Sequence, residues 1–204
     1  MRSKKDMPSA IELKRRADII QKAIETIADV GYEKTSLARI ADRVELSKGT
    51  ILYHFSNKDA LIKETALFIN RFGAAFMIPR LLQHNTARAK LKTYIEGSML
   101  FMQRYPEYMT AIVEIFQHVT EANGLRIYDE PEIMSYITDI ESILIDGQKN
   151  GELRQFSAEI MAITIRQALD AVPFEMRKNK QLDLETYGKE LAELFDIAVK
   201  KSSN

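Results

Sequence analysis

The residues whose types and spacing best suit chemistry lie close to position 50. A short predicted helix over residues 48–54 has one face of small, polar or hydrogen-bonding side chains, namely Lys48, Gly49, Thr50, Tyr53 and His54. Polar groups of this kind gain nothing from burial in an apolar core. Ammonium, hydroxyl and imidazole groups do hydrogen-bond with the phosphates and base edges that line a DNA major groove. The face therefore predicts a surface that contacts nucleic acid.

Two further helices are expected to position this face. A first helix over residues 9–31 begins at Ser9-Ala10-Ile11-Glu12, which matches a capping box. A second helix spans 36–44, and the turn Glu45-Leu46-Ser47 leads into the third helix with Ser47 placed to cap it. Two short helices joined by a tight turn and packed on a longer one describe a helix-turn-helix module. Its expected core is Leu37, Ile40, Ala41, Val44, Leu46, Ile51 and Phe55.

The charge of the chain is divided between its two parts. The 204 residues include 29 Lys or Arg and 29 Asp or Glu, which gives a formal net charge of zero. Residues 1–58 hold 12 basic and 8 acidic side chains, so this part carries +4 and the remainder −4. The field at a surface depends on nearby charges. The excess of positive charge in residues 1–58 therefore favours an anionic partner for the N-terminal part, although the net charge of the whole chain does not.

The remainder of the chain also has helical rather than strand periodicity. We expect a long helix over 58–78 that stops before Pro79, because proline lacks the N–H of a helix interior. Five more helices are expected, over residues 86–104, 107–118, 131–149 and 157–177 and from Asp183 onward. The helix over 157–177 is expected to be kinked at Pro173. The sequence thus predicts an all-α fold of about nine helices with domains at 9–57 and 58–204.

Several classes of protein are disfavoured by what the sequence lacks. There is no cysteine, so disulfides and thiolate metal sites are excluded. The histidines His54, His84 and His118 are scattered, and there is no His-Glu-x-x-His motif, glycine-rich phosphate loop or nucleophile elbow. Glu114 and His118 lie one turn apart and could share a metal, but a solvated pair explains them better. We expect no enzyme activity, cofactor or metal, no membrane span or secretory signal, and a cytoplasmic protein.

Several spaced motifs in the first quarter of the chain agree with one known pattern. They are Gly31-Tyr32-Glu33-Lys34-Thr35-Ser36, then Ile40-Ala41, then Ser47-Lys48-Gly49-Thr50-Ile51-Leu52-Tyr53-His54-Phe55, and then Lys58 and Leu61. Together they resemble the tetracycline-repressor (TetR) family of bacterial transcription regulators. A weaker similarity lies in Gly147-Gln148-Lys149-Asn150-Gly151-Glu152-Leu153. Leu52 departs from the pattern, because many members carry there a tyrosine that touches phosphate.

The resemblance implies DNA-binding roles for individual residues. They are Thr35, Ser36, Ser47, Lys48, Gly49, Thr50, Tyr53, His54 and Lys58. Thr35 and Ser36 would bind a phosphate through hydroxyl and backbone N–H groups at a helix start. Lys58 would pair with another phosphate, and Gly49 would allow close approach to the duplex. No arginine lies on the predicted recognition helix, so the bidentate arginine contact to guanine is missing there.

For residues 58–204 the resemblance implies a helical domain that binds an effector and forms a dimer. Methionine and aromatic side chains adapt to lipophilic ligands, and the candidate ligand-binding residues on inward stripes are Phe68, Phe72, Tyr94, Ser98, Met102, Met109, Phe116 and Met134. An ordinary helical core is the alternative for each of them. The last two helices could form a four-helix bundle with a second copy through Ile160, Ile163, Ala168, Leu169 and the stripe from Leu184 to Ala198.

We therefore expect a homodimeric, ligand-responsive transcription regulator that acts as a repressor. A twofold protein reads a palindrome, so the expected partners are a palindromic double-stranded DNA operator and a small lipophilic effector that releases it. The effector is expected to move the helix over 58–78. The alternative is a helical small-molecule-binding or interaction protein without DNA-binding activity. The departure at Leu52 and the small number of side chains on the predicted recognition helix that could contact bases leave this alternative open.

Overall fold

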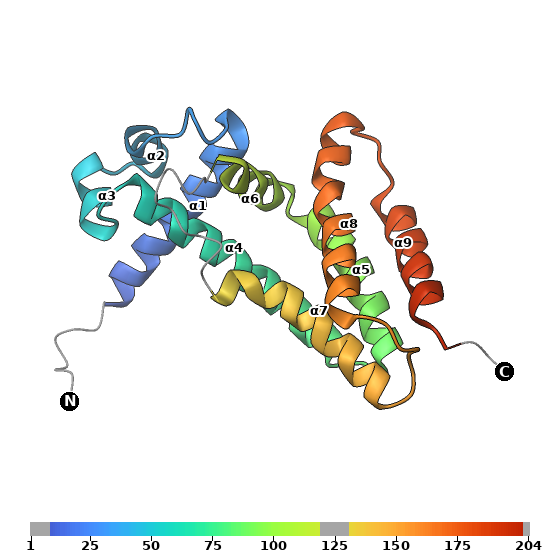
Figure 1. Ribbon diagram of the computed structural model, residues 1–204. Coiled ribbons are helices and arrows are strands. Elements are labelled where there is room, and N and C mark those ends of the chain that lie inside the picture. Colours follow the sequence, from blue (N-terminus) through green and yellow to red (C-terminus); the bar gives the residue numbers. More distant parts are fainter. Residues whose placement is uncertain (1–8, 119–130, 202–204) are drawn as a thin grey trace, which may run out of the picture. The chain divides into compact units, whose positions relative to one another are not determined.

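The computed structural model describes residues 9–118 and 131–201, and the side chains of residues 131–139 fall outside this description. Within the described ranges the regular structure is helical, apart from an isolated antiparallel bridge between Leu153 and Lys200. The all-α prediction is confirmed. The helices, labelled in Figure 1, are α1 (Ala10–Val30), α2 (Leu37–Val44), α3 (Lys48–His54), α4 (Lys58–Leu81), α5 (Ala87–Arg104), α6 (Pro106–His118), α7 (Pro131–Lys149), α8 (Ala158–Lys178) and α9 (Leu184–Val199).

The described residues divide into two compact units. The N-terminal unit comprises residues 9–69 and 110–118, and the C-terminal unit comprises residues 70–109 and 131–201. Both boundaries fall inside helices, one in α4 and one in α6. The sequence-based boundary at residue 58 thus lies at the start of a helix whose first half packs with the helix-turn-helix.

Side-chain caps define the short helices of the N-terminal unit. The Ser9 hydroxyl accepts from the Glu12 N–H and the Glu12 carboxylate accepts from the Ser9 N–H, which completes the expected capping box of α1. Ser36 caps α2 and Ser47 caps α3 in the same way, each accepting from an N–H three residues later. Between α2 and α3 the chain turns sharply at Glu45, whose φ of 56° is left-handed. The buried apolar residues of these helices include Ile24, Ile27, Ile40, Ile51 and Phe55.

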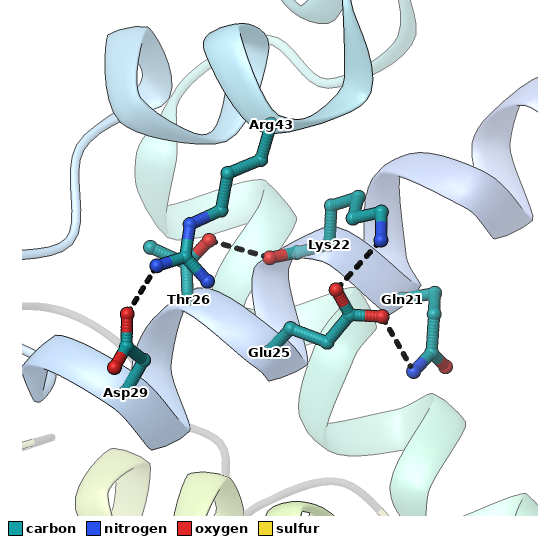
Figure 2. A network of polar contacts seen from close by, with 6 residues as sticks. All are labelled: Gln21, Lys22, Glu25, Thr26, Asp29 and Arg43. Carbon is teal, nitrogen blue, oxygen red and sulfur yellow. Dashed lines mark hydrogen bonds and ion pairs between the residues drawn. The ribbon is translucent and has the colours of Figure 1, made fainter.

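Polar contacts fix α2 on α1 (Figure 2). The guanidinium of Arg43 at the end of α2 forms an ion pair with Asp29 of α1. Within α1, Lys22 Nζ lies 2.7 Å from a Glu25 carboxylate oxygen, and the buried Thr26 hydroxyl donates to the Lys22 carbonyl at 2.6 Å. Exposed pairs of this kind contribute about 0–1 kcal/mol each. The Arg43–Asp29 pair is the one among these contacts that joins α2 to α1, and the apolar core supplies most of the stability.

Helix α5 is the centre of the C-terminal unit and packs against α7, α8 and α9. Their shared core is apolar and includes Leu91, Ile95, Ile140, Leu144 and Ile165. In the described part of the chain, none of the helices combines the length and the apolar character that a membrane span requires.

The segment from Gly147 to Leu153, which carries the weaker similarity, ties this unit together. Glu152 accepts a hydrogen bond from the N–H of Ala87 at 2.7 Å and so satisfies a free donor at the start of α5. Gly151 ends the turn with a φ of +74°, which favours glycine. A Cβ at Gly147 would lie 2.5 Å from the Ala87 Cβ, so only glycine fits there. The glycines of this motif thus serve packing and turn geometry.

The prediction that the long helix stops before Pro79 is wrong, because α4 continues through Pro79 to Leu81. A proline in the final turn removes only one helical hydrogen bond, and packing of the preceding turns can hold the helix together despite that loss. The side chain of Arg80 also donates to the carbonyl of Phe76 and stacks over its ring, which satisfies a carbonyl of the last turns. Pro173 likewise lies inside α8, which runs on to Lys178.

Candidate nucleic-acid interface

Helix α3 buries Ile51 and leaves its polar residues, together with Leu52, at least partly exposed. Ile51 is fully buried, whereas Lys48 and Gly49 are exposed and the Tyr53 side chain is 74% exposed. Thr50 and His54 are half-buried. The polar face predicted from the sequence is therefore accessible at the end of the helix-turn-helix. Its contact with DNA stays a prediction.

Ser47 positions the start of this helix. Its hydroxyl accepts from the Thr50 N–H at 3.0 Å and lies 2.9 Å from the Thr50 hydroxyl. Ser47 is exposed, so a phosphate oxygen could approach the same hydroxyl. The cap thus orients Thr50 toward the accessible face.

The loop before α2 places its two predicted phosphate ligands differently. Ser36 is exposed and caps α2. Thr35 is only 2% exposed, and its hydroxyl donates to the Gly31 carbonyl at 2.7 Å while its N–H donates to the Tyr32 carbonyl. In this structure the polar groups of Thr35 thus shape the loop instead of facing the solvent, which differs from the direct phosphate contact expected of its hydroxyl.

Lys58, at the start of α4, packs on the same loop. Its Nζ donates to the Tyr32 carbonyl at 3.1 Å and lies 4.5 Å from the centroid of the Tyr32 ring. Burial lowers the pKa of the Lys58 ammonium, and the neighbouring carboxylate of Asp59 opposes that shift. The ammonium therefore anchors the loop, and a phosphate could share it only from the solvent side.

Arg16 of α1 is a further residue of this region that sequence reasoning missed. Its guanidinium donates to the carbonyl of His54 at 2.5 Å and lies 4.3 Å from the centroid of the Phe55 ring. It also lies 3.7 Å from a carboxylate oxygen of Glu64 in α4. A cation is favourable at the carbonyl end of a helix. The basic run at positions 14–16 is the signal that could have suggested it.

The ends of α1 and α3 also meet through a carboxylate. The Tyr53 hydroxyl donates to Glu12 at 3.2 Å, and the Tyr53 and His54 rings meet edge to face with centroids 5.1 Å apart. Desolvation lowers the pKa of His54, the charges of Arg16 and Arg15 lower it further, and Glu12 opposes the shift. His54 is therefore neutral at neutral pH in the free protein.

Helix α6 contributes a third contact to the loop around Tyr32. The N–H of Tyr32 donates to the Glu114 carboxylate at 3.1 Å, and the His118 ring stacks on the Tyr32 ring with centroids 5.2 Å apart. Glu114 and His118 thus join α6 to the helix-turn-helix loop. Among the described residues, no three metal-ligating side chains gather as a possible metal site.

The predicted ligand-binding residues are distributed over both units. Phe68 and Phe116 are half-buried in the N-terminal unit, and the side chain of Met134 lies outside the described residues. In the C-terminal unit, Tyr94 and Met102 are buried in the shared core, against which Met109 packs. Their roles in binding stay predictions.

Ser98 and Phe72, the remaining two predicted ligand-binding residues, make the following contacts. The Ser98 hydroxyl donates to the backbone carbonyl of Tyr94 at 2.7 Å, so it is satisfied within its own helix. Phe72 belongs to an aromatic cluster, with ring centroids 4.9 Å from Tyr105 and 5.0 Å from Tyr108. These contacts are those of side chains packed in the protein, and a role of either residue in ligand binding stays a prediction.

The N-terminal unit has the architecture of a helix-turn-helix domain, and comparison with known proteins assigns it to a family. The family model described as "Bacterial regulatory proteins, tetR family" matches residues 19–65. The regulator BetI of Pectobacterium carotovorum is 34% identical over 86 residues, which cover 41% of this chain and 44% of that protein. The match therefore spans less than half the length of that relative.

Similarity over the whole chain is lower. The uncharacterized HTH-type transcriptional regulator YhgD of Bacillus subtilis is 26% identical over 201 residues, covering 94% of this chain and 97% of that protein. The crystal structure of the regulator FadR from Bacillus subtilis in complex with stearoyl-CoA superposes with a TM-score of 0.78 at 22% identity, covering 87% of this chain and 96% of that chain. This likeness shows a shared fold. Residues 19–65, which include the helix-turn-helix, thus match the tetR family of bacterial regulatory proteins.

Proposed function

We propose that this chain is a transcription regulator that binds a palindromic DNA operator as a homodimer through the exposed face of α3. The observation that carries the proposal is the division of α3, which buries Ile51 completely and leaves Lys48 and Tyr53 in solvent. A face of this composition suits phosphates and base edges. The alternative, a helical binding protein without DNA-binding activity, does not account for the match of residues 19–65 to a family of bacterial regulatory proteins.

Dimerisation is supported by apolar side chains that the chain leaves in solvent. Ile160, Ile163 and Phe174 are exposed on one face of α8, and Leu194 and Ile197 are exposed on α9. The expected participant Leu169 is instead buried in the core of the C-terminal unit. Exposed apolar patches rimmed by polar residues mark interaction surfaces. Pairing them with a second copy buries both faces and brings two recognition helices to one operator.

Effector release is the third part of the proposal. The solved FadR structure contains stearoyl-CoA, and the aromatic and methionine side chains of this chain suit a lipophilic ligand of similar class. An effector that converts 99% DNA-competent protein to 1% must prefer the incompetent state by roughly 5.5 kcal/mol. We infer that α4 transmits this preference, because it contributes to both units.

Fluorescence anisotropy on the full-length chain tests the function. The probe is a labelled duplex from the region upstream of the chain's own gene, and an unrelated duplex of equal length is the control. Tighter binding to the upstream duplex, weakened by stearoyl-CoA, is the expected result. Equal affinity for the two duplexes contradicts operator recognition, and an affinity that saturating stearoyl-CoA leaves unchanged contradicts release by an acyl thioester.

A further inference from the structure

The side chain of Tyr53 is held in the free protein by an acid of another helix. Tyr53 extends from α3 into solvent, and its hydroxyl donates to a carboxylate oxygen of Glu12 in α1 at 3.2 Å. The two residues are 41 positions apart in the sequence. A carboxylate therefore lies beside one of the exposed hydroxyls of the proposed DNA-binding face.

Contacts of Ser9 before Glu12 and of Arg16 after it hold Glu12 in position at the start of α1. Arg16, one turn after Glu12, donates to the His54 carbonyl and so joins α1 to the end of α3. Residues four apart share a helix face, which brings Glu12 next to Tyr53. The second carboxylate oxygen of Glu12 accepts the Ser9 N–H at 2.7 Å. The carboxylate therefore cannot turn away without giving up the capping box.

Glu12 is ionised in this position. The hydrogen bonds from the backbone and hydroxyl of Ser9 lower its pKa, and the bond from Tyr53 lowers it further. An ionised carboxylate and a phosphodiester are both acceptors for the same hydroxyl, and they repel each other at short range. The bond at 3.2 Å is longer than the usual 2.5–3.0 Å for a hydroxyl donor, so a phosphate oxygen can displace it.

We propose that Glu12 restrains DNA binding by competing with a backbone phosphate for the Tyr53 hydroxyl. Glu12 is thus a positioning residue that acts through Tyr53 from outside the recognition helix. The proposal rests on the DNA-binding function proposed above. It names the phosphodiester backbone of the duplex as the competing ligand.

The substitution Glu12→Gln isolates the charge. Glutamine serves the third position of a capping box as glutamate does, so helix content by circular dichroism and the melting temperature should stay at their wild-type values. Asp18→Asn is the matched control, because Asp18 is an exposed acid of the same helix and its loss changes the net charge equally. Affinity for the upstream duplex is measured by anisotropy for the wild type and both variants.

We expect Glu12→Gln to bind about three- to tenfold more tightly than the wild type, and Asp18→Asn to change affinity by less than about twofold. Tyr53→Phe leaves α1 untouched and should weaken binding by removing the hydroxyl. In the Tyr53→Phe background the gain from Glu12→Gln should shrink to that of Asp18→Asn, because the competition no longer exists. This double-mutant comparison separates a specific coupling from a general charge effect.

Two results overturn the proposal while leaving the proposed function intact. In the first, the wild type binds the upstream duplex and the Glu12→Gln variant binds it no more tightly. The other is a gain from Glu12→Gln that is as large in the Tyr53→Phe background as in the wild type. A wild type that binds neither duplex overturns the DNA-binding function, and this proposal with it.

Discussion

The backbone N–H of Tyr32 donates a hydrogen bond to the carboxylate of Glu114, a residue 82 positions later in the chain. The bond joins α6 to the loop that precedes α2, and Lys58 and His118 contact the same tyrosine. The loop that carries Ser36 is therefore held from α4 and α6 as well as from its own helices.

Removing the Glu114 carboxylate should loosen this loop. Glu114→Ala leaves the Tyr32 N–H without its acceptor and should lower the free energy of unfolding by about 1–2 kcal/mol, whereas Glu114→Gln keeps an acceptor oxygen and should lose less. Urea denaturation measures the change, and amide hydrogen exchange at Tyr32 should accelerate in Glu114→Ala. Glu193→Ala, at an exposed position of α9, is the control. Unchanged exchange at Tyr32 would show that the bond does not protect the loop.

The last turn of α7 should be intolerant of added volume at Gly147. In Gly147→Ala the new methyl group would meet the side chains of Ala87 and Leu153 at 2.5 and 2.6 Å. We expect the free energy of unfolding to fall by about 1–3 kcal/mol. Gly49→Ala is the comparison, because the nearest atom to its added Cβ, the Ser47 hydroxyl oxygen, would lie at 3.6 Å, an ordinary van der Waals contact. A loss for Gly49→Ala equal to that for Gly147→Ala would contradict a clash specific to Gly147.

DNA affinity should increase as the pH falls, because of His54. Desolvation and the charges of Arg16 and Arg15 depress the pKa of His54 in the free protein. A phosphate beside it favours the charged form and raises that pKa in the complex. DNA binding then takes up a proton, so affinity should rise between about pH 7.5 and about pH 5.5.

Anisotropy titrations of wild type and His54→Gln across that pH range test this linkage. The rise should disappear in His54→Gln, which cannot be protonated. A pH dependence that persists in the variant assigns the proton uptake to another group. The sign is itself diagnostic, since an affinity that falls with decreasing pH contradicts a phosphate at His54.

The exposed apolar faces of α8 and α9 should carry the dimer. Leu194 is 64% exposed in the single chain, so Leu194→Glu should leave the fold intact and disrupt association. Leu82, which is 75% exposed just after α4, provides the control substitution Leu82→Glu. Size-exclusion chromatography with light scattering should report a dimer for the wild type and the control, and a monomer for Leu194→Glu. A Leu194→Glu dimer would place the interface elsewhere.

Local patterns were sufficient to predict much of the fold. The capping box of α1, the caps at Ser36 and Ser47, and the burial of Ile51 opposite Lys48 all follow from residues close together in sequence. Such features are encoded by helical periodicity and by the need of helix ends for hydrogen-bond partners.

Other features depend on contacts that no local pattern encodes. The bonds of Tyr53 to Glu12 and of Arg16 to His54 join positions 41 and 38 apart. From the sequence alone, helical spacing predicts that α1 buries Ala17, Ile20, Ile24, Ile27 and Ala28. In the structure Ala17 is exposed, and Ile19, which is not in that set, is fully buried. Burial of the larger apolar side chain rotates the packed face, because buried apolar area determines the gain. Only the packed structure reveals these relationships.

The salt dependence of DNA binding reports whether Lys48 on the exposed face of α3 meets a phosphate. Affinity for the upstream duplex is measured over a range of salt concentrations for wild type, Lys48→Ala and Lys180→Ala, which removes an exposed lysine outside the proposed face. We expect Lys48→Ala to bind more weakly, with the slope of log K against log salt reduced by about 0.9 for each Lys48 that meets a phosphate. We expect Lys180→Ala to keep the wild-type affinity and slope. A Lys48→Ala variant with wild-type affinity and slope would contradict the assignment of the α3 face as the DNA-binding surface.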